Sequence, residues 1–344
     1  MSPVHARPSA GTHSGRTPSG CCAIPLGKNT LPLAALGDAP QSGTMTQTVG
    51  RIESIDPPYD GSLRVKSVIN PMRTVMRKML IEISRRTGMM EPTYRVYEFL
   101  KTLNLPTLYR NMQFRIKGDA SGIPTPPAKL IMLVVGHSDI QGFLGEGSQA
   151  VETITTTLKK HGIDINNFQR ILDFGCGCGR VIRHWHSLRN TAVFGTDYNP
   201  QLIEWCKSHL KFAQFGTNEL LPPLSYESGS FDFLYALSVF THLPEDAQHQ
   251  WIEELSRILK PGGYLLITTH GEFYLNVLTQ SERMEFEAGN LVVRYQEVAG
   301  TNMCSTFQSE GNVRRTLTHG FEMIDFVPKI HQGQDVYLLK KTAS

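Results

Sequence analysis

Three glycines at alternate positions are the first feature of this sequence that could serve chemistry. Gly175, Gly177 and Gly179 follow directly on an apolar run that ends at Phe174. Because glycine has no side chain, such a loop can turn tightly and leave bare backbone against a ligand. A dinucleotide-binding loop has two residues between its second and third glycines, whereas only Cys178 stands there in this chain. The spacing therefore favours a ligand other than NAD.

One carboxylate is placed to bind a ribose. Asp197 follows the apolar segment 192–196, and an acidic residue about twenty residues after a glycine loop has this role in adenosine-binding sheets. The alternative is that Asp197 caps a helix predicted to begin at Pro200, but Asn199 is closer to that N-cap position. We therefore predict that Asp197 anchors the ribose of a nucleoside.

Two histidines follow predicted strands and could act as bases. His242 comes shortly after the segment 231–237, and His270 comes directly after the segment 264–269. An imidazole titrates near neutral pH, so either side chain could accept a proton from an acceptor group. The alternative for each is a packing or capping role. We predict a catalytic role for His270 or His242, and the sequence leaves open which of them it is.

The six cysteines lack the spacing of a metal site. Cys21 and Cys22 are adjacent, and Cys176 and Cys178 alternate about a glycine, with no further ligands nearby. We expect no bound metal and reduced thiols, as in the cytoplasm. Cys304 is expected to be a small buried residue rather than a nucleophile.

From residue 168 onward, strand and helix patterns alternate. Strands are predicted at 170–174, 192–196, 212–215, 231–237, 264–269, 321–327 and 335–340, with helices at 180–188, 200–209, 244–259 and 310–319. This alternation predicts an α/β fold with a doubly wound, mostly parallel sheet of seven strands. The last two strands are joined by the short segment 329–334, too short for a helical crossover, so a C-terminal antiparallel hairpin should close the sheet.

Four segments, in this order, resemble the successive motifs of class I (Rossmann-like) S-adenosylmethionine-dependent methyltransferases. They are the glycine run after Asp173, Asp197 at a strand tip, and the segments 231–237 and 259–264. The resemblance covers residues 168–341 and implies an enzyme that uses S-adenosyl-L-methionine as its cofactor. It also implies a cofactor site that contains Asp173, Gly175, Cys176, Gly177, Gly179, Asp197, Tyr198, Thr217, Asn218 and Leu237.

The resemblance implies a role for the parts of this site. The three glycines would lie under the methionine and ribose parts of the cofactor, and Asp197 would hold the ribose. Tyr198 would flank the adenine, and Thr217 or Asn218 would meet the adenine edge. Asn218 departs from the acidic residue frequent at its position, although an amide can also pair with an adenine edge.

Outside the cofactor site, we expect a tail, a lid or substrate segment, and an insertion that binds the methyl acceptor. Residues 1–50 are rich in small and polar residues without a period, so we expect a disordered tail. Residues 51–165 are predicted to form a helical N-terminal lid or substrate segment, with a basic amphipathic stretch at 64–86. Residues 166–344 are predicted to form the cofactor-binding domain, in which the long insertion 272–308 should build the acceptor pocket.

The net charge and the length of the apolar runs indicate which partners to expect. With 34 Lys and Arg against 31 Asp and Glu, the net charge is only +3, so we expect no nucleic-acid partner. No apolar run is long enough to cross a membrane. The sequence does not decide whether the protein binds a membrane surface peripherally, nor which oligomeric state it has.

We expect O-methylation of a small-molecule acceptor, which could be a natural product, a sugar or a lipid. The alternatives are an RNA or protein methyltransferase that docks through the basic segment 64–86, and a catalytically inert cofactor-binding scaffold.

Overall fold

The computed structural model describes residues 84, 86, 87, 104–119 and 121–343. All of these belong to one structural unit, Ile69–Ser344. The tail expected at 1–50 lies outside the described residues, as does nearly all of the basic stretch expected at 64–86.

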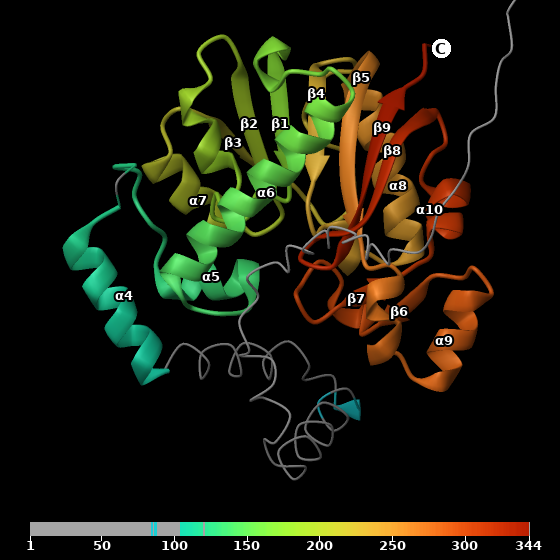
Figure 1. Ribbon diagram of the computed structural model, residues 1–344, viewed down its shortest axis with the longest axis horizontal. Coiled ribbons are helices and arrows are strands. Elements are labelled where there is room, and N and C mark those ends of the chain that lie inside the picture. Colours follow the sequence, from blue (N-terminus) through green and yellow to red (C-terminus); the bar gives the residue numbers. More distant parts are fainter. Residues whose placement is uncertain (1–83, 85, 88–103, 120, 344) are drawn as a thin grey trace, which may run out of the picture. The chain divides into compact units, whose positions relative to one another are not determined.

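Seven strands form one sheet in the order β3, β2, β1, β4, β5, β9, β8 (Figure 1). The first five in the chain run parallel: β1 Arg170–Phe174, β2 Ala192–Asp197, β3 Gln214–Thr217, β4 Phe231–Ala236 and β5 Leu259–Thr269. β9 Gln334–Lys341 lies antiparallel between β5 and β8 Phe321–His331. The predicted fold class is confirmed, including the closing hairpin.

Helices cover both faces of the sheet. One hydrophobic cluster joins the sheet to α5 Ala128–Val135, α6 Ile140–Lys160, the 3-10 helix η3 Ile182–Ser187 and α7 Pro200–His209. A second cluster joins it to α8 Glu245–Ile258 and α10 Glu310–Thr316. α4 Leu105–Lys117 precedes these elements and packs on the first cluster through Phe114.

Alternation along the strands decides which side chain enters which cluster. Ile171 of β1 pairs with Phe233 of β4, and both are fully buried in the first cluster. Their neighbours Leu172 and Leu234 also pair and are fully buried in the second. Because successive side chains of a strand point to opposite faces, a strand buried on both faces needs this continuous apolar run.

Two predicted elements differ in their bounds. The helix predicted at 180–188 is the shorter 3-10 helix η3, which begins only after a tight contact with α6: a Cβ at Gly147 would overlap the Arg180 carbonyl. β3 begins at Gln214, later than predicted, because Phe212 stands in a turn, where its ring lies edge-on to the His186 ring.

The insertion 272–308 forms a small unit of its own. It consists of η5 Glu272–Val277, α9 Gln280–Glu287, β6 Val292–Arg294, η6 Gln296–Val298 and β7 Ser305–Phe307. β6 and β7 pair antiparallel, a second sheet that the sequence did not predict. The Gln308 amide donates to the His270 carbonyl at 3.0 Å, which ties the end of the insertion to β5. Among the described residues, no helix combines the length and apolarity needed to cross a membrane.

The closing hairpin should carry much of the stability of the sheet. Leu339 of β9 is fully buried in the second cluster, so Leu339→Ala should lower the free energy of unfolding by about 2–5 kcal/mol. Ile330 of β8 is 48% exposed, so Ile330→Ala should change it by less than about 0.5 kcal/mol. Denaturant unfolding measures both values. Equal effects of the two substitutions would contradict the packing described here.

Candidate cofactor and acceptor site

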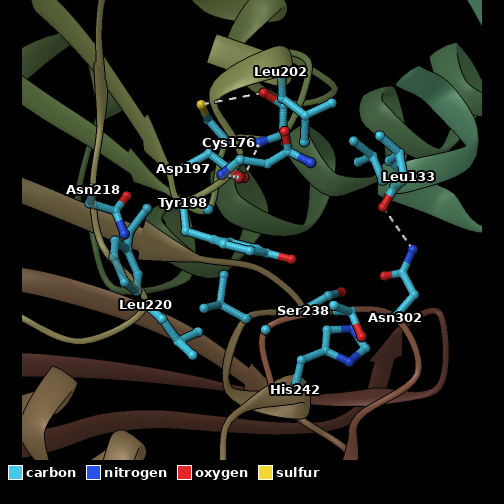
Figure 2. Close-up of a pocket in the computed structure, with 18 of the residues that line it drawn as sticks. Leu133, Cys176, Asp197, Tyr198, Leu202, Asn218, Leu220, Ser238, His242 and Asn302 are labelled. Carbon is cyan, nitrogen blue, oxygen red and sulfur yellow. Dashed lines mark hydrogen bonds between the residues drawn. The ribbon is translucent and has the colours of Figure 1, made fainter. Parts of the chain in front are cut away.

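A cavity of about 1110 Å³ lies beyond the carboxyl ends of β1, β2 and β4. Its walls also include residues of α5 and the insertion residues 297–302. The predicted site residues that line it are Asp173, Gly175, Cys176, Gly177, Asp197, Tyr198, Asn218, Leu237 and His242 (Figure 2). Gly179, Thr217 and His270 are not among the lining residues.

The glycine loop is folded so that its backbone faces the cavity. Gly175, Gly177 and Gly179 all have positive φ angles, of +77°, +55° and +83°, which side chains disfavour. A Cβ at Gly177 would lie 2.7 Å from Cγ2 of Val134 in α5. The amides of Gly175 and Cys176 both donate to the Thr196 carbonyl, which fixes the loop against β2.

Asp197 joins the glycine loop to the end of β2. Its Oδ2 accepts a hydrogen bond from the Gly177 amide and its Oδ1 accepts one from the Asn199 amide, both at 2.9 Å. Asp197 is 8% exposed, and burial raises the pKa of its carboxyl to about 6 against these hydrogen bonds. Asn199, not Asp197, caps α7, because its side chain accepts from the Gln201 amide. Each carboxylate oxygen keeps a lone pair for a further donor.

Two charged residues flank the glycine loop in the sequence, Asp173 before it and Arg180 after it. Asp173 is 3% exposed, and burial raises the pKa of its carboxyl to about 7, partly offset by the Tyr235 hydroxyl and by Arg180. Arg180 also lines the cavity, and its Nη1 has no hydrogen-bond partner although it is buried. Arg180 was not among the predicted site residues, although its position directly after the glycine loop was an available signal.

The predicted adenine wall contains more than Tyr198 and Asn218. The Asn218 amide is already engaged, because its Oδ1 accepts from the Thr196 hydroxyl and its Nδ2 donates to the Glu219 carbonyl, both at 2.7 Å. Leu220 lines the same wall, and Gly300 packs so closely that a Cβ there would lie 2.8 Å from Leu220. Neither residue was predicted, because the approach of the insertion is a tertiary contact.

His242 presents a free imidazole nitrogen. Its Nδ1 lies 2.6 Å from the Cys304 carbonyl, which can only accept, so Nδ1 carries the proton. Nε2 is therefore the unprotonated nitrogen, and the residue lines the cavity near Tyr198 and Ser238 (Figure 2). Burial lowers the pKa of His242, which favours the neutral ring.

His270 occupies a different position. Its Nδ1 lies 3.0 Å from the Thr306 carbonyl, and its ring packs against Tyr274 and Phe307 at centroid distances of 4.3 and 5.2 Å. Burial lowers the pKa of His270 to about 4, with the nearby His242 as a smaller cause. The structure thus brings His242 to the cavity, while His270 lies behind it at a centroid distance of 6.5 Å.

A hydrogen bond joins the insertion to α5 at the edge of the cavity. Asn302 of the insertion donates through Nδ2 to the Leu133 carbonyl of α5 at 2.8 Å (Figure 2). On the same side, Ser238 has a φ of 59° and is held there by Thr268, whose Oγ1 accepts from the Ser238 amide. These contacts join segments far apart in the sequence, so no local pattern could predict them.

The residues present fit S-adenosyl-L-methionine. Asp197 offers carboxylate oxygens to ribose hydroxyls, and the glycine loop offers a surface free of side chains. The buried, unpaired Nη1 of Arg180 matches the carboxylate at the amino-acid end of the cofactor. Of the described residues, no group of three or more His, Cys, Asp or Glu side chains could hold a metal ion.

Comparison with known proteins identifies the domain. Residues 172–267 match the family model described as a methyltransferase domain. Residues 172–267 are therefore similar to a methyltransferase domain. Among solved structures, a SAM-dependent methyltransferase from Methanosarcina mazei is 22% identical, with a TM-score of 0.43 over 54% of this chain and 98% of that chain. The methyltransferase family implies S-adenosyl-L-methionine as the cofactor, as predicted.

Curated relatives of the methyltransferase domain differ in their acceptors. The tRNA N(3)-methylcytidine methyltransferase trm140 of Schizosaccharomyces pombe is 32% identical over 31% of this chain and 38% of its own length. The sterol 24-C-methyltransferase ERG6A of Gibberella zeae is 28% identical over 48% of this chain and 42% of its own length. The chain therefore spans about two fifths of the length of these relatives, and the comparison leaves its acceptor undetermined.

The expectation of no nucleic-acid partner is wrong. The fission-yeast relative and one from Mus musculus, 27% identical over 46% of this chain, are both named as tRNA methyltransferases. The expectation relied on a net charge of +3, which averages over the whole chain. Residues 64–117 alone contain twelve Lys and Arg against three Glu, a local basic excess that the average conceals.

Substitution of Asp197 tests the cofactor site. Asp197→Ala removes a charged acceptor whose hydrogen bonds are worth roughly 1.5–3 kcal/mol each, so S-adenosyl-L-methionine should bind more than about tenfold more weakly. Asp197→Asn keeps the shape and one acceptor, so its loss should be smaller but clear. Calorimetry on the purified variants measures both affinities, and melting temperatures control for folding. If a folded Asp197→Ala variant bound S-adenosyl-L-methionine as tightly as the parent, Asp197 would not be part of the cofactor site.

Proposed function

We propose that this chain transfers a methyl group from S-adenosyl-L-methionine to an acceptor bound beside His242. The cofactor supplies an electrophilic methyl group on its sulfonium. In this proposal Asp197 holds the ribose, the glycine loop supports the cofactor backbone, and Arg180 binds its carboxylate. The observation that carries the proposal is that Asp197 and the free Nε2 of His242 line one cavity.

We propose a small-molecule hydroxyl as the acceptor. A cavity of about 1110 Å³ is slightly larger than the usual range of about 300–1,000 Å³ for small-ligand pockets, so a compact acceptor fits beside the cofactor. Leu133, Val134 and Val298 give the cavity apolar walls, and the Asn302 contact closes one side. The attacking hydroxyl would give its proton to Nε2 of His242 as its oxygen takes the methyl group. A reducing cytoplasmic setting suits the free Cys176, Cys178, Cys206 and Cys304.

A base nitrogen of tRNA is the second candidate acceptor. It is favoured by the names of the relatives and by the basic excess of residues 64–117. A cytosine N3 already carries its lone pair, so it needs no base to remove a proton before it attacks. The base would have to leave its stack to enter the cavity.

Fractionated labelling separates the two acceptors. The protein is incubated with methyl-labelled S-adenosyl-L-methionine and a cell extract divided into small molecules, lipids, RNA and protein. Label in the small-molecule or lipid fraction supports the first candidate, and label in the RNA fraction supports the second. Heat-treated protein is the control. Cofactor binding without label in any fraction would contradict the proposed activity and favour the inert scaffold.

Substitution of His242 tests the role of the base. With a hydroxyl acceptor, His242→Ala should lower kcat about 100-fold or more and leave the cofactor Kd nearly unchanged, because the imidazole acts on the acceptor. Since burial lowers the pKa of His242 below its usual 6.5, the parent should keep the unprotonated base at pH 6.5. His270→Ala is the matched control, and kcat and Kd are measured for each. If His242→Ala turned over the hydroxyl acceptor at the same rate as the parent, His242 would not be the general base.

A further inference from the structure

Helix α4 packs through its polar side. Asn111 is 6% exposed; its Nδ2 donates to the Ser138 carbonyl at 2.6 Å and its Oδ1 accepts from the Ile140 amide at 3.0 Å. Thr107, one turn earlier, is also buried, and Phe114 packs against the first cluster. These contacts attach α4 at the start of α6 and determine which side of α4 faces outward.

The outward side of α4 is apolar. Five large side chains are exposed, by 76, 40, 58, 53 and 80%: Leu105, Leu108, Tyr109, Met112 and Ile116. Their spacing along the helix places them on neighbouring turns, so they form one continuous stripe. A helix that buries Asn and Thr and exposes Leu, Met and Ile has the reverse of the usual arrangement, and such a stripe indicates a binding surface.

The same helix is exclusively basic. α4 contains no acidic residue; of its three basic residues, Arg110 pairs with Asp139 at 3.5 Å, and Arg115 and Lys117 stand in the final turn. The surrounding sequence has the same bias, with twelve Lys and Arg against three Glu in residues 64–117. The whole chain is nearly balanced, so positive charge is concentrated in the segment that contains the exposed stripe.

We propose that α4 docks this protein on an anionic membrane surface. An amphipathic helix of this kind lies in the interface, with its apolar side among the acyl chains and, here, Arg115 and Lys117 at the headgroups. RNA would satisfy Arg115 and Lys117 but leave Leu105 and Ile116 uncovered. A second copy of the chain would bring the same basic residues together, and like charges repel.

The proposed surface is connected to the cavity. After Gly118 the chain continues to α5, whose residues Leu133 and Val134 line the cavity. This connection is held by Arg115, which donates to the Pro126 carbonyl, and by the buried Arg183, which donates to the Ile123 carbonyl. Docking through α4 would therefore place an element of the cavity wall close to the membrane. The proposal concerns the surface and does not require that the acceptor be a lipid.

Vesicle binding by the full chain tests this proposal. The protein is mixed with phosphatidylcholine vesicles that contain or lack roughly one quarter phosphatidylserine, and the bound fraction is measured by sedimentation. We expect binding to the anionic vesicles that weakens as the salt concentration rises. The variant Leu105→Gln/Ile116→Gln should bind at least about tenfold more weakly. The control Val277→Gln/Met284→Gln changes two apolar side chains of the insertion, exposed by 51 and 64%, and should bind like the parent.

Several results would overturn the proposal. These are failure of the parent to bind anionic vesicles, equal binding by the parent and the Leu105/Ile116 variant, and equal loss in the control. Binding of tRNA that is lost in the variant, without vesicle binding, would assign α4 to an RNA interface. A parent dimer that the variant converts to monomer, or a large loss of melting temperature in the variant, would show that protein covers the stripe.

Discussion

The hydrogen bond from the Gly177 amide to the Asp197 carboxylate joins the loop that follows β1 to the end of the adjacent strand β2. This hydrogen bond requires a loop that turns with positive φ. Glycine adopts such angles readily, and the chain has glycine at positions 175, 177 and 179. The hydrogen bond also requires β2 to end beside that loop, which the parallel pairing of β1 with β2 ensures. The cofactor surface, the ribose acceptor and the approach of Val134 all depend on this local arrangement.

The sheet could be predicted because the sequence features that specify its strands lie within the strands themselves and in the short segments between them. Each strand shows its burial in its own apolar run, and the length of the segment 329–334 decides that the last two strands pair antiparallel. The predicted ends of β3 and η3 were displaced because contacts with His186 and with Gly147 are tertiary. The small sheet of β6 and β7 was missed because its strands are only three residues long.

The candidate site was predictable in part for the same reason. The glycine loop and Asp197 follow strands directly, so their placement at one sheet edge follows from topology. The two histidines looked equivalent in the sequence and became distinct only through the fold: His242 lines the cavity, while His270 is enclosed by Tyr274 and Phe307. The proton positions of both depend on carbonyl groups of the insertion, which no motif indicates.

The cavity, as we interpret it, holds the cofactor between the strand ends and the insertion, with its transferable methyl group toward His242. A crystal structure with S-adenosyl-L-homocysteine, the demethylated form of the cofactor, tests this most directly. We expect the ribose hydroxyls within hydrogen-bond distance of the Asp197 carboxylate, the ligand carboxylate at Arg180, and the sulfur facing the side of the cavity that contains His242. A ligand bound elsewhere, or with its sulfur turned away from His242, would contradict the account.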